Sequence, residues 1–248
     1  MAKVPYQSCL GAIMYAMLGT RPDIGFAVTT LGQFASNPGQ AHWVAMKRLL
    51  RYLRGTLDDK MHYGLAHDRS QLAQSVIGYS DSNYADDVDD RKSVGAYVFL
   101  LFGGAISWQA KKQSTVALSS TEAEYMAVTQ AAREALWWRA FMTSLGCPTL
   151  SPSTLYSDNQ GCIALSKNPE YHSRTKHIDV KHHFVRQCVE NGSLTLAFVG
   201  TTEMAADMLT KALSRDKHQH CMSLIGVHGT PTPSGASGSV ENVENHAS

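Results

Sequence analysis

The chain has 248 residues, of which 44% are hydrophobic and 17% charged, and its formal net charge is +1. This composition excludes a chain that is disordered throughout, and the charge gives no global electrostatic case for nucleic-acid binding. The five cysteines are scattered and lack a C-x-x-C pair, which favours reduced thiols over a disulfide framework or a zinc site. We therefore expect a cytoplasmic or nuclear location.

The amino-terminal part of the chain predicts helices. Its first residues contain no apolar core of signal-peptide length, and no run of about eighteen apolar residues occurs, so we expect neither a signal peptide nor a membrane span. Apolar patterning predicts helices near residues 10–18, 24–34 and 40–53. Residues 1–57 are thus expected to form a small all-helical segment, followed by a connector over residues 58–74.

From Val76 onward the pattern changes to strands. Residues 76–81 form an apolar run that ends on Asp81, as a buried central strand would. Two further strands over residues 93–102 and 105–109, joined at Gly103-Gly104, must be its antiparallel neighbours. A long helix follows over residues 122–145. The remaining elements are a strand, two helices, a strand and a helix, over residues 154–157, 159–166, 178–190, 194–199 and 202–212.

These elements define an α/β domain over residues 75–226, with a mixed sheet and helices on its faces. The Gly-, Pro-, Ser- and Asn-rich residues 227–248 cannot bury a core, and we expect them to be disordered.

Four acidic residues can meet at one edge of this sheet. Asp81 and Asp158 each end a strand in a Tyr-Ser-Asp sequence, at the position where open α/β sheets bind ligands. Glu124 lies on the small, apolar face of the long helix, whereas Glu122 is expected in solvent or as a first-turn dipole partner. Asp207 lies in a late helix. Asp is also common where a strand meets a turn, and this structural alternative stays open for each strand-end Asp taken singly.

Carboxylates that gather in this way repel one another unless cations neutralise them. Oxygen ligands without Cys or well-placed His favour Mg²⁺ or Mn²⁺ over zinc. Two such ions about 4 Å apart can activate a water and stabilise the leaving oxygen of a phosphoryl displacement. The predicted chemistry is phosphodiester hydrolysis, with catalytic and metal-binding roles for Asp81, Glu124, Asp158 and Asp207.

Several motifs resemble a known family. They are Gly-Tyr-Ser-Asp at 78–81, Ile-Ser-Trp at 106–108, Leu-Ser-Ser-Thr-Glu-Ala-Glu-Tyr at 118–125, Asp-Asn-Gln at 158–160 and Ala-Asp-Met-Leu-Thr-Lys at 206–211. These motifs are similar to the ribonuclease H domain of copia-type retrotransposon polyproteins. Upstream, the end of the reverse transcriptase region is matched by residues 6–15, 20–24 and 42–55.

The resemblance implies a ribonuclease H-like fold with a mixed five-stranded sheet and an Asp-Glu-Asp-Asp site for two metal ions. It implies an endonuclease that hydrolyses the RNA strand of RNA–DNA hybrids, with the polymerase region as a further partner. The catalytic Asp pair of a polymerase is not in the sequence, so we do not expect DNA synthesis.

Four more residues are candidates for substrate binding: Lys111, Lys112, Asn159 and His177. The two lysines precede the long helix and are suited to contact a phosphate backbone, although a basic loop is also commonly only solvated. His177 lies in a Lys-His-Ile-Asp segment that the family shares. No carboxylate or Cys partner is spaced with it for a metal site, so a structural or substrate-side role is expected.

One short motif points to a different class of function. Arg48-Leu49-Leu50-Arg51 matches the Arg-x-Leu-Arg motif of secreted oomycete effectors, which act inside plant host cells to suppress defence. Under this alternative Arg48, Leu50 and Arg51 form a targeting motif, the chain is secreted and enters the host cell, and its partners are host proteins. The same residues lie on an amphipathic helix that copia-type proteins also carry. The effector alternative therefore remains open.

Overall fold

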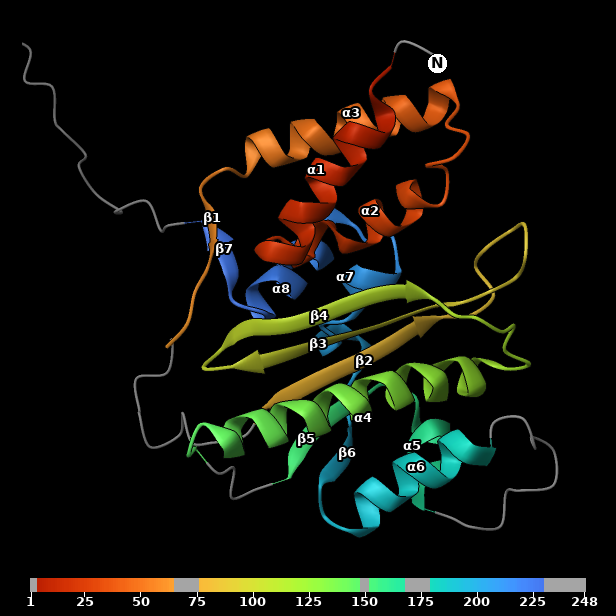
Figure 1. The fold of residues 1–248 in the computed structure, drawn as a ribbon, viewed down its shortest axis with the longest axis vertical. Coiled ribbons are helices and arrows are strands. Elements are labelled where there is room, and N and C mark those ends of the chain that lie inside the picture. Colours follow the sequence, from red (N-terminus) through yellow and green to blue (C-terminus); the bar gives the residue numbers. More distant parts are fainter. Residues whose placement is uncertain (1–3, 65–75, 148–151, 168–178, 230–248) are drawn as a thin grey trace, which may run out of the picture.

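The computed structural model describes residues 4–64, 76–147, 152–167 and 179–229. A five-stranded sheet lies at the centre, with helices on both of its faces (Figure 1). Its strands are β2 (Ile77–Asn83), β3 (Val94–Leu101), β4 (Gly104–Lys112), β5 (Ser153–Ser157) and β6 (Leu194–Phe198). In the order β4-β3-β2-β5-β6, the first three strands are antiparallel, while β5 runs parallel to both β2 and β6. The predicted fold class is confirmed.

The central strand β2 is hydrogen-bonded to β3 on one side and to β5 on the other, and the two pairings end at different residues of β2. Pairing with β5 stops where Tyr79 lies opposite Tyr156, whereas pairing with β3 continues to Asn83. Asp81 and Asp158 each follow that last tyrosine pair by two residues, so both emerge at the same edge. Gly78 allows close packing of the strand, because a Cβ there would lie 2.4 Å from a ring carbon of Phe99.

The hairpin between β3 and β4 turns at Phe102-Gly103, one residue earlier than the expected Gly103-Gly104. Both turn residues have positive φ, 54° at Phe102 and 78° at Gly103, as a two-residue hairpin turn of the primed type requires. Gly104 instead begins β4. It must be small there, because a Cβ would lie 2.5 Å from the carbonyl oxygen of His62.

One face of the sheet is covered by α4 (Ser120–Ser144), α5 (Gln160–Lys167) and α6 (Asp179–Glu190) (Figure 1). The long helix α4 is capped by Ser119, whose hydroxyl accepts the N–H of Glu122 at 3.1 Å. Val128 and its small neighbours on α4 are fully buried against Phe99 and Leu155 of the sheet. This packing fixes the helix over the central strands.

The other face carries η3 (Thr201–Glu203), α7 (Asp207–Thr210) and α8 (Arg215–Leu224). The prediction of one helix over residues 202–212 is wrong, because Met204 is extended and residues 204–206 pack into the core as an irregular segment. Helix α8 was not predicted. Its sequence is mostly polar, and it buries only Cys221 and Met222.

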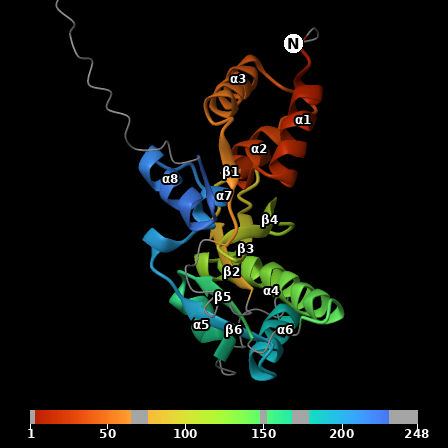
Figure 2. The ribbon, with the colours of Figure 1, turned by 90° about the vertical axis from the view of Figure 1, so that its left-hand side faces the viewer.

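The amino-terminal helices are α1 (Tyr6–Gly19), η1 (Pro22–Ile24), α2 (Gly25–Gly32) and α3 (Gln40–Gly55). They share a core of their own, and α2 also contacts α7 and β4 (Figure 2). The indole N–H of Trp108 on β4 donates to the carbonyl of Met17 at 2.9 Å. The helical segment therefore lies on the same face of the sheet as α7 and α8. None of the helices in the described ranges is long and apolar enough to cross a membrane.

A second, two-stranded sheet joins the expected connector to the expected tail. Strand β1 (Asp59–Met61) pairs antiparallel with β7 (Val227–Gly229). The predicted start of disorder at residue 227 is thus too early. No local pattern in the sequence indicates a partner strand about 170 residues away. Residues 230–248 lie outside the described ranges. The division into a helical segment and an α/β domain stays a prediction.

Candidate metal centre

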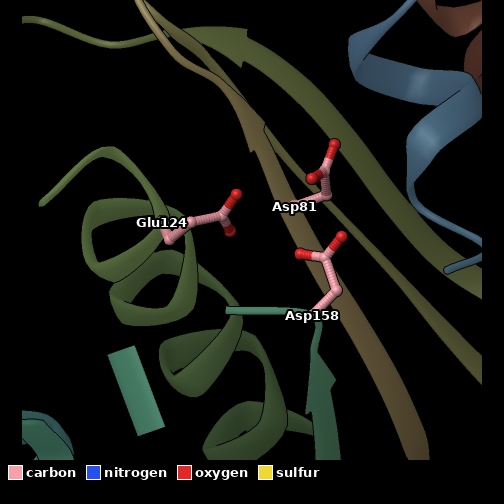
Figure 3. A group of neighbouring side chains, drawn as sticks. All are labelled: Asp81, Glu124 and Asp158. Atoms are coloured by element: carbon pink, nitrogen blue, oxygen red, sulfur yellow. The ribbon is translucent and has the colours of Figure 1, made fainter. Parts of the chain in front are cut away.

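Three carboxylates converge at the edge of the sheet where β5 ends. Asp81 comes from β2, Glu124 from the first turns of α4 and Asp158 from the residue after β5, and their side chains point toward one another (Figure 3). One oxygen of each carboxylate lies within 4.8 Å of the other two. A hard cation with oxygen ligands at roughly 2.0–2.6 Å can bridge oxygens at that separation. The all-oxygen donor set therefore fits a divalent ion such as Mg²⁺.

Glu124 is the acid whose environment calls most strongly for a cation. Its side chain is 6% exposed; Oε1 accepts the N–H of Ser82 at 3.3 Å, and no group in the described ranges donates to Oε2. Burial, together with the charges of Asp81 and Asp158, raises the pKa of Glu124 to about 9. Without a metal ion this carboxyl group holds a proton at neutral pH.

Of the two expectations for Glu122, the position in solvent is wrong, and the place in the first turn of the helix is confirmed. Glu122 is 7% exposed, and its Oε2 accepts the N–H of Leu118 at 2.9 Å, while its own N–H donates to Ser119. The Ser119 hydroxyl caps the helix, and the Glu122 carboxylate holds the residue before that cap. Glu122 therefore stabilises the first turn of the helix. Glu124 is the acid of this helix that lies in the candidate metal centre.

Asp207 lies outside the group of three and has two lysine partners. It begins α7 and is fully buried; Lys211 Nζ lies 2.8 Å from its Oδ1, and Lys217 contacts its Oδ2. Lys211 also lies 3.1 Å from Asp81 Oδ1, and the hydroxyl of Thr210 donates to Asp81 Oδ2. Thr210, Lys211 and Lys217 are not among the predicted site residues. The available signal was the Asp-Met-Leu-Thr-Lys motif, whose spacing places Lys211 one turn beyond Asp207.

These contacts shift the ionisation of the buried groups. Burial raises the pKa of Asp81, and Asp207 adds to that effect, whereas Lys211 and Thr210 lower it. Burial lowers the pKa of Lys211, but Asp81 and Asp207 outweigh burial, so the pKa of Lys211 lies above its ordinary value. Lys211 therefore carries its positive charge between two carboxylates.

Of the predicted substrate-binding lysines, Lys112 is already paired. Its ammonium lies 2.6 Å from Asp87 and 2.9 Å from Asp90, and this lysine lowers the pKa of Asp87 to about 2. These ion pairs tie the acidic loop after β2 to β4. Lys111, by contrast, is exposed and lines a hollow of about 240 Å³ together with Gln130 and Lys181.

The two other predicted substrate residues differ in what the structure describes. Asn159 is the cap of α5, because its Oδ1 accepts the N–H of Cys162 at 2.9 Å. It follows Asp158 directly and so borders the metal centre. His177 lies outside the described residues.

The strand order, the long helix across one face and the carboxylates at the edge of β2 and β5 define a protein of the ribonuclease H-like class. The Pol polyprotein of transposon TNT 1-94 from Nicotiana tabacum is 47% identical over 228 residues, which are 92% of this chain and 17% of that polyprotein. The Pol polyprotein of transposon RE2 from Arabidopsis thaliana is 40% identical over 230 residues, 93% of this chain and 15% of that one. The chain is thus similar to one part of the Pol polyproteins of copia-type retrotransposons, and it spans less than a fifth of their length.

A relative of a different kind is Secreted RxLR effector protein 161 from Plasmopara viticola. It is 53% identical over 137 residues, which cover 55% of this chain and 93% of the effector. Among solved structures, LC11-RNase H1 superposes with a TM-score of 0.44 and 13% identity, over 56% of this chain and 94% of that one. No protein-family profile matches the chain.

Proposed function

We propose that this chain is a ribonuclease H-type endonuclease that hydrolyses the RNA strand of RNA–DNA hybrids with two Mg²⁺ or Mn²⁺ ions. The observation that carries the proposal is the convergence of Asp81, Glu124 and Asp158 within 4.8 Å. One buried oxygen of Glu124 has no hydrogen-bond partner among the residues that the structure describes. The chain spans only 17% and 15% of the length of the two polyproteins.

Metal ions bound at this site would activate a water and stabilise the leaving oxygen of the RNA phosphodiester. Asp81 and Asp158 are fixed by the paired strands, and Glu124 by the capped start of α4 and its bond to Ser82. The three side chains are thus preorganised on rigid elements. Asp207 on α7 is linked to Asp81 by Lys211, whose ammonium contacts both carboxylates. We propose Asp207 as the fourth ligand residue.

The substrate proposal follows from the surface beside the metal centre. Lys111, Gln130 and Lys181 border the hollow between β4 and α4, where two ammonium groups and an amide are suited to bind a phosphate backbone. Asn159 borders the site from the other side. The 2′-hydroxyl distinguishes RNA from DNA in such a duplex, so we expect pure DNA to be spared.

The direct test is cleavage of a labelled RNA–DNA hybrid by the purified chain with Mg²⁺, Mn²⁺ or EDTA. Asp158→Asn should lower the rate at least about a hundredfold, because losing a metal ligand costs several kcal/mol of transition-state stabilisation, at ~1.4 kcal/mol per tenfold. Asp89→Asn is the matched control, since Asp89 is exposed on the loop after β2. Absence of metal-dependent cleavage by the unmodified chain rejects the proposal.

We further propose that the chain works together with the polymerase region of the polyprotein, in the cytoplasm or nucleus. Co-purification of the chain with a separately expressed polymerase region tests this partnership. Failure of the two to associate would contradict it.

A second candidate is an RxLR-type effector that is secreted and acts on host proteins in plant cells. Its support is the similarity to the effector from Plasmopara viticola and the exposed Arg48, Leu50 and Arg51 on α3. The chain carrying both Asp81→Asn and Asp158→Asn separates the candidates when expressed in plant cells. Undiminished suppression of defence by this variant would favour the effector, and no suppression by the unmodified chain would reject it.

A further inference from the structure

The four acidic side chains of the centre fall into two halves that are neutralised differently. In one half, Asp81 and Asp207 are fully buried, and two lysine ammonium groups face them. Lys211 lies between the two carboxylates, and Lys217 contacts only Asp207. Two negative charges thus meet two positive charges, so this pair of carboxylates is balanced without any metal ion.

The other half has no such balance. Within the ranges that the structure covers, neither Glu124 nor Asp158 lies at ion-pair distance from a lysine or arginine. In these ranges, the hydroxyl of Thr201 donates to Asp158 at 3.0 Å, and no donor reaches the buried Oε2 of Glu124. A cation entering the centre gains most on this side, where it displaces no ammonium group.

We propose that Lys211 is a resident cation that fills the position a second metal ion needs between Asp81 and Asp207. The first ion then binds among Asp81, Glu124 and Asp158, and a second ion binds only when the Lys211 ammonium withdraws. This inference rests on the proposed function, since it describes how the same centre loads its metal ions.

Lys211 is built for such an exchange. Its side chain is 36% exposed, although both of its carboxylate partners are fully buried, so the ammonium lies at the mouth of the site. The four-carbon stem of lysine is flexible, and a withdrawn ammonium can remain in water. Withdrawal without replacement would leave buried carboxylates uncompensated, which is strongly unfavourable. A dication that takes its place removes this obstacle, and Lys217 stays on Asp207.

The test is Mn²⁺ binding to the full chain, measured by calorimetry and by the electron paramagnetic resonance signal of free Mn²⁺. The unmodified chain should bind one ion tightly and a second at least about tenfold more weakly. Lys211→Met should tighten the second step at least about tenfold while changing the first much less. Lys217→Met, the matched control on Asp207, should change the affinity for the second ion less than Lys211→Met does. Lys211→Arg keeps the charge, so the second ion should still bind weakly.

A second readout is the melting temperature in EDTA and in saturating Mn²⁺. Lys211→Met should melt lower than the unmodified chain in EDTA, and the difference should shrink when metal is bound. If this variant does not fold, Lys211→Gln, which keeps a hydrogen-bond donor, carries the same expectation. Two equal binding steps in the unmodified chain, or an unchanged second step in the folded variants, overturns the role of Lys211. If the unmodified chain bound no Mn²⁺ at all, the proposed metal centre itself would be rejected.

Discussion

Gly95 of β3 lies directly against Ala127 of α4, so that a Cβ on this glycine would come within 3.3 Å of the alanine Cβ. Gly95 is also the strand partner of Ser82, whose N–H donates to Glu124, and Ala127 lies one turn beyond Glu124. Two small side chains therefore set how closely α4 approaches the sheet. That approach decides whether the Glu124 carboxylate reaches the metal centre.

Gly95→Val should push α4 away from the sheet. We expect a loss of roughly 1–3 kcal/mol of stability, as for other overpacked sites, together with weaker Mg²⁺ binding because Glu124 moves with the helix. Chemical denaturation and metal titration measure the two effects. Gly11→Ala on α1 is the control, since no atom lies within 4 Å of a Cβ there and alanine favours helix. Unchanged metal affinity in a destabilised Gly95→Val would contradict the link between packing and site.

Glu124→Gln and Glu122→Gln should behave very differently, although the two acids lie two residues apart. Glu124→Gln removes a charge from the metal centre, and we expect hybrid cleavage to fall at least about a hundredfold. Glu122→Gln keeps an oxygen that can accept the Leu118 N–H, so the start of the helix and the cleavage rate should survive nearly intact. The reverse ranking in a cleavage assay would show that the site assignment is wrong.

Metal affinity should rise with pH, because a cation must displace the proton from Glu124. The pKa of this group is raised from 4.5 to about 9 in the metal-free protein. Its contribution to stability is therefore full below pH 4.5 and is lost as pH rises toward 9. The melting temperature in EDTA should fall as the pH rises through this window. The increase in melting temperature caused by Mg²⁺ should become larger over the same pH range.

The matched variant for this pH dependence is Glu124→Gln, whose side chain does not titrate. Its melting temperature in EDTA should vary less with pH between 5 and 9 than that of the unmodified chain. Calorimetric Mg²⁺ titrations at several pH values provide the second measurement. An affinity that is flat across this range would argue against a proton on Glu124.

Lys111 and Lys112 should separate into one substrate contact and one structural ion pair. Lys111→Met should weaken hybrid binding and reduce the slope of log affinity against log salt by about one, as expected for a lost phosphate contact. Lys112→Met should leave that slope nearly unchanged, because its ammonium is held by Asp87 and Asp90. Fluorescence anisotropy with an Asp158→Asn background measures both. Equal effects of the two substitutions would contradict the assignment.

Much of the metal centre was predictable because it depends on strand ends. The repeated Tyr-Ser-Asp sequence placed Asp81 and Asp158 at one edge, and the tyrosine pair at 79 and 156 confirms that register. The small-residue face of α4 likewise singled out Glu124. In each of these cases a local pattern determines the side on which the carboxylate lies.

The remaining features depend on contacts that no local pattern encodes. The burial of Glu122 was not predicted, because it depends on the N–H of Leu118, in the segment before the helix start. Lys211 reaches Asp81 only because α7 packs under β2, which brings together residues 130 positions apart. The polar helix α8 has too narrow an apolar stripe to predict from sequence, and tertiary packing supplies its stability.

The antiparallel pair of β1 and β7 brings the entrance and the exit of the α/β unit to one place. Met61 lies opposite Val227, and the N–H of His62 donates to the carbonyl of Gly226 at 2.8 Å. The two ends of the intervening 165 residues are thus held side by side by the β1–β7 pair. A circular permutant that joins these two ends by a short linker and opens the chain elsewhere, in an exposed turn such as that near Gly192, should therefore retain the same sheet order.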